Sequence, residues 1–253
     1  MDISLVAADT KEAFFNQLSD CIDEKLSNSQ ADKVRDFAAL YYDQSDLEEL
    51  EGKALNDVFG SAFGWWNFIQ QSDISGPKLR VFNPSLEEDG WLCGHTVVAV
   101  LQRDMPFLVD SIRIEVNRRN IDIHAVKSTV VTVSRDKNGK LQDVIAKGGK
   151  QKSAKNKQYH QEAMVYLEIN LHTDEAAMQE LADSLRSVLR DVDIVVADYR
   201  PLLDQVERTR ANLEFSKQGL ISDNAKEADA FLTWLADGHF TLLGYVEYEF
   251  EGK

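Results

Sequence analysis

The chain has 253 residues, of which 43% are hydrophobic and 28% charged, the composition of an ordinary soluble globular protein with one or two domains. Its formal net charge of −15 disfavours binding to nucleic acid or to an anionic membrane, because most of the surface would repel phosphate groups. The first residues do not resemble a secretory signal, and no apolar run approaches the roughly 20 residues that span a bilayer. We therefore expect a cytoplasmic protein.

Helical periodicity dominates the first third of the chain. Asp9 with Glu12 predicts a capped helix that ends near residue 28, with its apolar side chains on one face. A second helix is expected over residues 31–42. These patterns predict a helical subdomain over residues 1–75.

A longer third helix is expected to begin at Ser45 and Glu48, which have capping-box spacing, and to run to about residue 70. Gly60 and Gly64 lie inside this helix and indicate a kink or a close approach of another element. The tryptophan pair at residues 65–66 predicts an anchor in the core or in an interface.

After residue 77 the pattern changes from helical to extended. Residues 79–82 predict a short strand, and residues 95–101 form a near-continuous apolar run typical of a buried strand. A strand-to-helix turn at Asp104, Met105 and Pro106 leads into a helix that begins at Phe107. Its buried stripe is predicted at Leu108, Val109, Ile112 and Val116.

The next segment predicts a return strand and a hairpin. One face of the strand is expected to carry Ile121, Ile123, Ala125, Val131 and Val133. Asn138 and Gly139 predict a tight turn into an additional strand at residues 141–146. Residues 147–160 contain five lysines; a mobile solvated loop is favoured over a phosphate-binding loop, because Gly-x4-Gly-Lys-Ser/Thr spacing is absent.

Another strand, helix and strand are predicted after this loop. Apolar and polar residues alternate again over residues 163–171, which predicts a strand. Asp174 can cap a helix whose apolar stripe extends to Leu189, and residues 194–197 are expected to form the last strand. The fold class is therefore α+β, with a ferredoxin-like βαββαβ antiparallel sheet over residues 76–200 and both helices on one of its faces.

Helices are expected to follow the sheet. Pro201 is tolerated at the first position of a helix that ends at Gly219, and Ser222 or Asp223 caps another helix through residue 235. Residues 201–238 thus predict a helical linker, and the strand-like residues 239–253 predict the start of a further, truncated domain.

The predicted sheet and helices resemble an ACT domain, the ferredoxin-like module that senses amino acids in many metabolic enzymes. The resemblance implies that the loop after the first strand and the start of the first helix contact an effector. Many such modules have glycine where this chain has Phe107, whose ring could fill the pocket, and this departure favours a packing role. The implied effector-binding residues are Asp104, Met105, Pro106, Phe107, Leu108 and Asp110.

Two stretches carry a second resemblance, DMPFLVDSIRIEVNRRNIDIH and FLTWLADGHFTLLGYVEYEF. In their sequence and spacing, the chain resembles the N-terminal part of the large bacterial NAD-specific glutamate dehydrogenases. The resemblance covers essentially the whole chain. It implies a parent enzyme several times longer, in which this region precedes the catalytic domain. Such a parent would convert L-glutamate to 2-oxoglutarate and ammonia and reduce its cofactor NAD.

The chain itself lacks the patterns that this chemistry needs. No Gly-x-Gly-x-x-Gly turn occurs, so no cofactor-binding residue is assigned. The five histidines are scattered, and Cys21 and Cys93 lack CxxC spacing, so we expect reduced thiols and assign no metal site. Asp104 and Asp110 could form an acid pair, but they fit a turn and a helix start better. The chain is predicted to be catalytically inactive.

Two functions remain open at this point. In the first, the chain is a regulatory module that binds an amino acid or another small effector at residues 104–110 and biases a distant catalytic domain. In the second, it is a structural and oligomerisation module without a ligand, which pairs its sheet and uses its aromatic N-terminal helices. The expected partners are the other domains of the parent enzyme and further copies of the chain.

Overall fold

The protein is described by a computed structural model that covers residues 4–72, 76–145, 158–216 and 223–248. The chain divides into two compact units, Met1–Leu189 and Arg190–Lys253. Residues 147–157 of the predicted lysine-rich loop lie outside the described residues, as do the predicted helix end at Gly219 and cap at Ser222. In the described part, no helix has the length and apolar character needed to cross a membrane. The expected domain boundaries at residues 75, 200 and 238 stay predictions.

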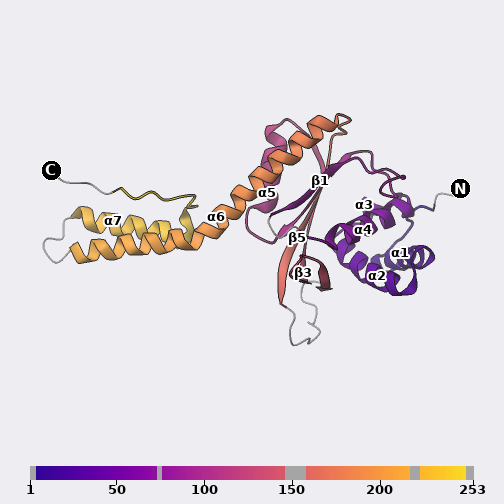
Figure 1. The fold of residues 1–253 in the computed structure, drawn as a ribbon, viewed down its shortest axis with the longest axis horizontal. Coiled ribbons are helices and arrows are strands. Elements are labelled where there is room, and N and C mark those ends of the chain that lie inside the picture. The colour runs from indigo at the N-terminus through magenta and orange to yellow at the C-terminus, as the bar shows by residue number, and fades with distance from the viewer. Residues whose placement is uncertain (1–3, 73–75, 146–157, 217–222, 249–253) are drawn as a thin grey trace. The chain divides into compact units, whose positions relative to one another are not determined.

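The N-terminal helices of the first unit are α1 (Lys11–Lys25), α2 (Asn28–Tyr42), the short α3 (Leu47–Leu50) and α4 (Leu55–Ile69) (Figure 1). The cap of α1 is Thr10, not the predicted Asp9, because the extended Thr10 accepts a 3.1 Å hydrogen bond from the Ala13 amide. The face with Phe14 and Leu18 is buried, as predicted.

The single long helix predicted from Ser45 is wrong, since the chain leaves the helical conformation between α3 and α4. Gly52 has a φ of +74°, a left-handed conformation that ends α3. The Gly52 amide donates to the Val6 carbonyl at 3.0 Å, and the Val6 amide donates to the Lys53 carbonyl at 2.9 Å. This pairing with the N-terminal segment is a long-range contact that a local capping pattern does not reveal.

The sheet of the first unit has five antiparallel strands in the order β1-β2-β5-β3-β4. The predicted α+β class, the antiparallel sheet and the extra hairpin strand are confirmed. Helix α5 (Leu108–Arg118) connects β2 to β3, and α6 (Glu175–Ser216) follows β5. The strands are β1 (Lys78–Phe82), β2 (Thr96–Arg103), β3 (Ile123–Arg135), β4 (Leu141–Ile145) and β5 (Tyr159–Ile169).

The predicted last strand at residues 194–197 is wrong, because α6 continues through it to Ser216 and includes Pro201. Ile194 is 58% exposed and none of residues 194–197 is fully buried, so the β-branched run lacks the buried face of a sheet strand. In the βαββαβ plan the last strand pairs with one edge of the first strand, which corresponds to β2 in this chain. That edge of β2 is already paired with β1. The complete ferredoxin-like order is therefore not formed.

Each face of the sheet is covered by helices (Figure 1). Helix α5 and the first part of α6 pack on one face through Leu108, Ile112, Leu181 and other apolar residues. The N-terminal helices pack on the opposite face, where Trp65 and Trp66 are buried against the sheet. The tryptophan pair is therefore a core anchor of this chain.

Strand β3 contains a β-bulge that changes which side chains face each layer. The register shifts between Ile123 and Ala125. Ile123 packs with α5 and α6, whereas Val131 and Val133 belong to the core below the N-terminal helices. The prediction that the apolar residues between 121 and 133 share one face of the strand is wrong. The bulge reverses the alternation of side chains between the two faces of the sheet.

Two contacts attach loops of the sheet to α4. Gly60 is a close-approach site, as predicted, because a Cβ there would lie 2.5 Å from the Cβ of Trp91. The predicted hairpin turn at Asn138-Gly139 docks on the end of α4, where Gln71 Nε2 donates to the Asn138 carbonyl at 2.6 Å. The Ser72 amide donates to the Gly139 carbonyl at 3.0 Å and the Leu141 amide to the Gln70 carbonyl at 2.9 Å, which adds backbone hydrogen bonds across this junction.

The second unit contains the rest of α6, helix α7 (Asp223–Trp234) and the π-helical turn η1 (Leu235–His239). Arg210 Nε lies 3.2 Å from Asp229 Oδ1, an ion pair that joins α6 to α7. Residues 239–248 form no β-strand, contrary to the prediction.

Candidate functional site

The predicted effector-binding residues lie in the turn between β2 and α5, residues 104–107, and in the first turn of α5, which holds Leu108 and Asp110. The Asp104 amide donates to the Gln161 carbonyl at 3.0 Å, so the turn is fixed to the start of β5. Met105 packs against the core under α5, and Leu108 is buried in it. The exposed members of the set are Asp104, Pro106, Phe107 and Asp110.

Phe107 is the N-cap residue of α5 and has a left-handed backbone, with φ 67° and ψ 0°. This conformation costs a residue with a Cβ roughly 1–2 kcal/mol, whereas glycine adopts it freely. The residue is 53% exposed, so the described part of the chain does not enclose the ring.

Gln102 brings a buried polar group to the same turn. The residue is 7% exposed, and its Nε2 lies 3.8 Å from the Met105 sulfur. Among the described residues, its Oε1 has no hydrogen-bond partner. A buried acceptor without a donor costs about 1–3 kcal/mol.

A pocket of about 310 Å³ lies elsewhere in the first unit, between the N-terminal helices and the sheet. Its polar lining comes from the loop before β2, from β3 and β5, and from α2 and the start of α4. The side chains with polar or ionisable groups in this lining are Tyr41, Tyr42, Lys53, Asp57, Ser61, Cys93, His95, Lys127, Tyr166 and Glu168.

Three side chains converge in this pocket. The ligand atoms of Cys93, His95 and Glu168 all lie within 4.8 Å of one another. His95 Nδ1 is 3.1 Å from Glu168 Oε2, and the Tyr166 hydroxyl donates to the other carboxylate oxygen at 2.8 Å. Burial raises the pKa of the Cys93 thiol and also that of the Tyr166 phenol.

Lys127 supplies a positive charge to the pocket. Its Nζ donates to Ser45 Oγ at 3.2 Å and lies 5.6 Å from the centre of the Tyr42 ring. Burial lowers the pKa of the Lys127 ammonium. The side chain faces the pocket because the bulge near Ile123 precedes it in β3 and sets the alternation.

A protein-family model described as "Glutamate dehydrogenase, ACT1 domain" matches residues 37–185, more than half of the chain. The chain belongs to this family. The match covers the end of α2, then α3, α4, the whole sheet, α5 and the first part of α6. The ACT1 match therefore includes α3 and α4 of the N-terminal helical layer as well as the sheet.

Three relatives are named NAD-specific glutamate dehydrogenase. That of Halomonas elongata is 38% identical over 234 residues, which cover 92% of this chain and 14% of the relative. That of Pseudomonas aeruginosa is 33% identical over 246 residues, 97% of this chain and 15% of the relative. That of Mycobacterium tuberculosis is 26% identical over 168 residues, 60% of this chain and 10% of the relative. The chain thus spans about one seventh of the first two relatives, and the predicted resemblance to this family is confirmed.

Sequence reasoning assigned the turn of the ACT1 module but missed the pocket. Cys93 and His95 have Cys-x-His spacing, the one local signal that could have drawn attention to them. Glu168 lies 73 residues after His95 in the chain and reaches it only through the pairing of β2 with β5. Cys21 and Cys93 are free thiols, as predicted.

Proposed function

We propose that the chain is a non-catalytic regulatory module of an NAD-dependent glutamate dehydrogenase and that it binds an amino acid at the turn of residues 104–110. Family membership and the names of the relatives support the parent activity, which is conversion of L-glutamate to 2-oxoglutarate and ammonia with reduction of NAD. NAD is proposed for the parent enzyme and not for this chain. The parent is proposed to act in the cytoplasm, with no nucleic-acid or membrane partner.

The unpaired Oε1 of Gln102 is the observation that carries this proposal. An α-ammonium group is a strong donor and would satisfy this buried acceptor, while the exposed Asp104 and Asp110 add negative charge at the same turn. The first amides of α5 have no partner within the helix and would meet the α-carboxylate. The turn therefore offers complementary groups for both charges of an amino acid.

The experiment compares thermal unfolding with and without a panel of amino acids. A ligand at 100 times its Kd stabilises the folded state by about 2.7 kcal/mol, so a binder would raise the Tm measurably. Gln102→Leu is expected to remove this shift, and the surface substitution Gln179→Leu is the matched control. If Gln102→Leu kept the full shift, binding would lie elsewhere.

A second function, oligomerisation without a ligand, is supported by two exposed apolar side chains on α5. Phe107, the N-cap residue, is 53% exposed, and Ile114, within the helix, is 66% exposed. The alternative predicts a dimer that Ile114→Asp dissociates in analytical ultracentrifugation. The aromatic N-terminal helices do not support this function, since Trp65 and Trp66 are buried in the core of the chain.

Contact with other domains of the parent enzyme is also proposed. In the second unit, the large apolar side chains of Phe231, Trp234, Phe240, Leu243, Val246 and Tyr248 are between 45% and 77% exposed. Such a concentration of exposed apolar groups is typical of a surface that another domain covers.

A further inference from the structure

We propose that Cys93, His95 and Glu168 form a binding site for a transition-metal ion of the Zn²⁺ class, with a fourth coordination position open to the pocket. Nothing in the family name or in the names of the relatives refers to such a site. It lies on the face of the sheet that the N-terminal helices cover, whereas the proposed effector turn lies beside α5. The inference therefore stands apart from the proposed function.

The three donor types determine the class of metal. A thiolate, an imidazole nitrogen and a carboxylate oxygen are all established zinc ligands, and the soft thiolate disfavours Mg²⁺ and Ca²⁺. Three protein ligands with one open position are typical of zinc sites that bind an exchangeable water or ligand. A thiolate and a carboxylate together also balance the double charge of the ion.

The spacing of the donors is close to what coordination needs. Bonds of about 2.0–2.3 Å at tetrahedral angles place donor atoms about 3.3–3.8 Å apart. His95 Nδ1 and Glu168 Oε2 are 3.1 Å apart, and all three donors lie within 4.8 Å. Small side-chain rotations would bring the Cys93 sulfur into range, since Cys93 and His95 share one loop and Glu168 projects from the neighbouring strand.

The surrounding side chains orient two of the donors. The Tyr166 hydroxyl bonds to Glu168 Oε1, the oxygen that does not face His95. The His95 ring stacks on the ring of His124 with centroids 4.2 Å apart, and His124 Nε2 lies 2.6 Å from Asn170 Oδ1. Such contacts around the ligands fix ring and carboxylate orientation in metal sites.

The open position faces a pocket with a second positive group. Lys127 and the three donors line the same 310 Å³ space. A ligand that bound the metal in this pocket would meet both the ion and the ammonium, so the site would favour a small anion.

The test is a titration of the chelator-treated chain with Zn²⁺ alone, in competition with a chromophoric chelator. We expect one ion per chain and an affinity that Cys93→Ser lowers at least about 100-fold. Cys21→Ala is the matched control, because Cys21 is the other cysteine and is buried in α1, and it should leave the affinity unchanged. Absence of binding at one equivalent, or equal binding by Cys93→Ser, would overturn the proposal.

Co²⁺ substitution gives a second readout that does not depend on the stability of a variant. A thiolate-to-Co²⁺ charge-transfer band is expected in the wild-type chain, together with protection of Cys93 from alkylation by one equivalent of Zn²⁺. An unprotected Cys93 or a missing charge-transfer band would contradict thiolate coordination.

Discussion

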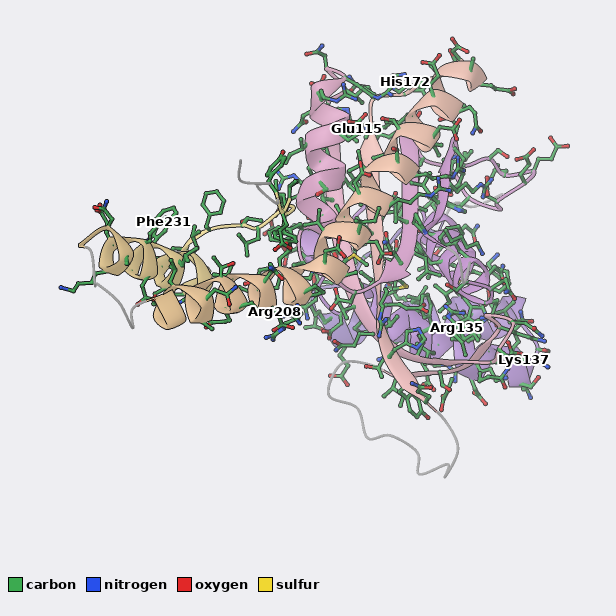
Figure 2. All side chains as sticks on the ribbon, turned by 60° about the vertical axis from the view of Figure 1, so that its left-hand side comes forward. Glu115, Arg135, Lys137, His172, Arg208 and Phe231 are labelled. Carbon is green, nitrogen blue, oxygen red and sulfur yellow. The ribbon has the colours of Figure 1, made fainter. Side chains whose placement is uncertain are left out.

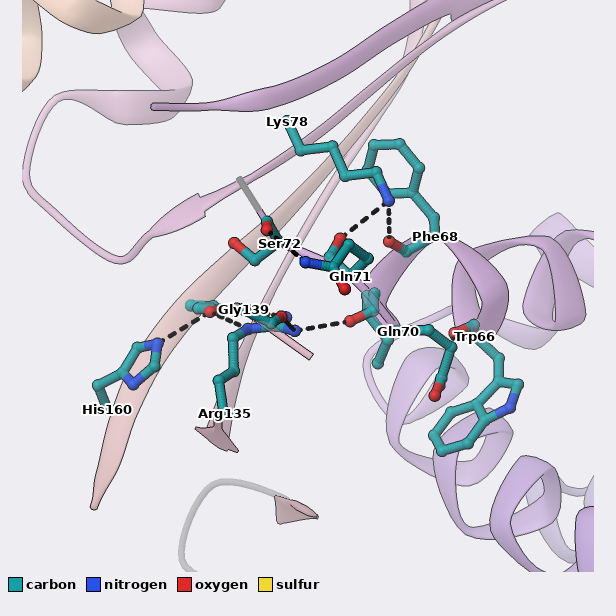
Figure 3. Close-up of polar contacts among 11 residues, drawn as sticks. Trp66, Phe68, Gln70, Gln71, Ser72, Lys78, Arg135, Gly139 and His160 are labelled. Carbon is teal, nitrogen blue, oxygen red and sulfur yellow. Dashed lines mark hydrogen bonds and ion pairs between the residues drawn. The ribbon is translucent and has the colours of Figure 1, made fainter. Parts of the chain in front are cut away.

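Replacing Arg135 by methionine is expected to destabilise the first unit by about 3–5 kcal/mol, because the buried carboxylate of Glu162 would lose its cation. Arg135 Nε and Nη2 each donate to a different Glu162 oxygen at 2.6 Å, and both side chains are at most 6% exposed. Arg135 Nη1 also donates to the carbonyls of Ile69 and Gly139 at 2.9 Å, which ties α4 to the hairpin (Figure 3). The variant would therefore break four hydrogen bonds, two of which form the ion pair with Glu162.

Among the described residues, the imidazole of His160 is a polar group that would remain beside the carboxylate. His160 Nε2 lies 2.8 Å from Glu162 Oε1 and compensates the charge only when it is protonated. The double variant Arg135→Met with Glu162→Met removes both charges, so most of the lost stability should return. The two substitutions together form a double-mutant cycle with a large favourable coupling.

Urea unfolding, followed by tryptophan fluorescence, measures the free energy of unfolding by linear extrapolation. Trp65, Trp66 and Trp91 are buried in the first unit and report on it. The control Arg113→Met, on the exposed face of α5, should stay within about 0.5 kcal/mol of the wild type. A loss below about 1 kcal/mol for Arg135→Met, or a double variant no better than the single one, would refute this reasoning.

Three further substitutions test other features. Gly60→Ala should cost about 1–3 kcal/mol in urea unfolding because Trp91 fills the space, whereas Gly64→Ala, whose Cβ would lie 3.5 Å from Trp91 Nε1, should cost much less. Phe107→Gly should leave the Tm nearly unchanged, because relief of about 1–2 kcal/mol at the left-handed position offsets the greater chain entropy of glycine. Glu115, on α5 and bonded to α6, is held by Arg118, Ser184 and Arg119 at a pKa of about 2, below its ordinary 4.5 (Figure 2). At 1.36 kcal/mol per pKa unit this lowering stabilises the fold by about 3 kcal/mol above pH 5, and the contribution is lost as the pH falls towards 2. Glu115→Gln should therefore show a smaller loss of stability between pH 5 and pH 2 than the wild type.

Local sequence patterns predicted the elements whose signals are contained in a single segment. The apolar run of β2 and the stripe of α5 were recognisable because each lies against the sheet core along its whole length. Asp174 caps α6, as predicted, since its Oδ1 accepts a 2.9 Å hydrogen bond from the Ala176 amide.

The errors arise where a distant segment decides the local structure. Residues 194–197 have strand-like composition, but β1 already occupies the sheet edge that a last strand would need. The bulge after Ile123 inverts the faces of β3, and no residue near it marks the change. The break after α3 likewise depends on pairing with residues 4–6.

The same difference between local signals and long-range contacts separates the two candidate sites. The turn at residues 104–110 could be proposed from the sequence because its residues are contiguous and carry a family resemblance. The left-handed backbone of Phe107 gives a physical reason for glycine at this position in similar modules. The triad of Cys93, His95 and Glu168 could not be assigned, because the register of β2 against β5 brings its members together.

The central claim, amino-acid binding at the turn before α5, is tested most directly by isothermal titration calorimetry of the chain with each common amino acid. The account predicts saturable heat for at least one amino acid, with one site per chain, and loss of that heat in Gln102→Leu but not in Gln179→Leu. No heat with any amino acid would contradict the claim and leave the oligomerisation function as the supported one.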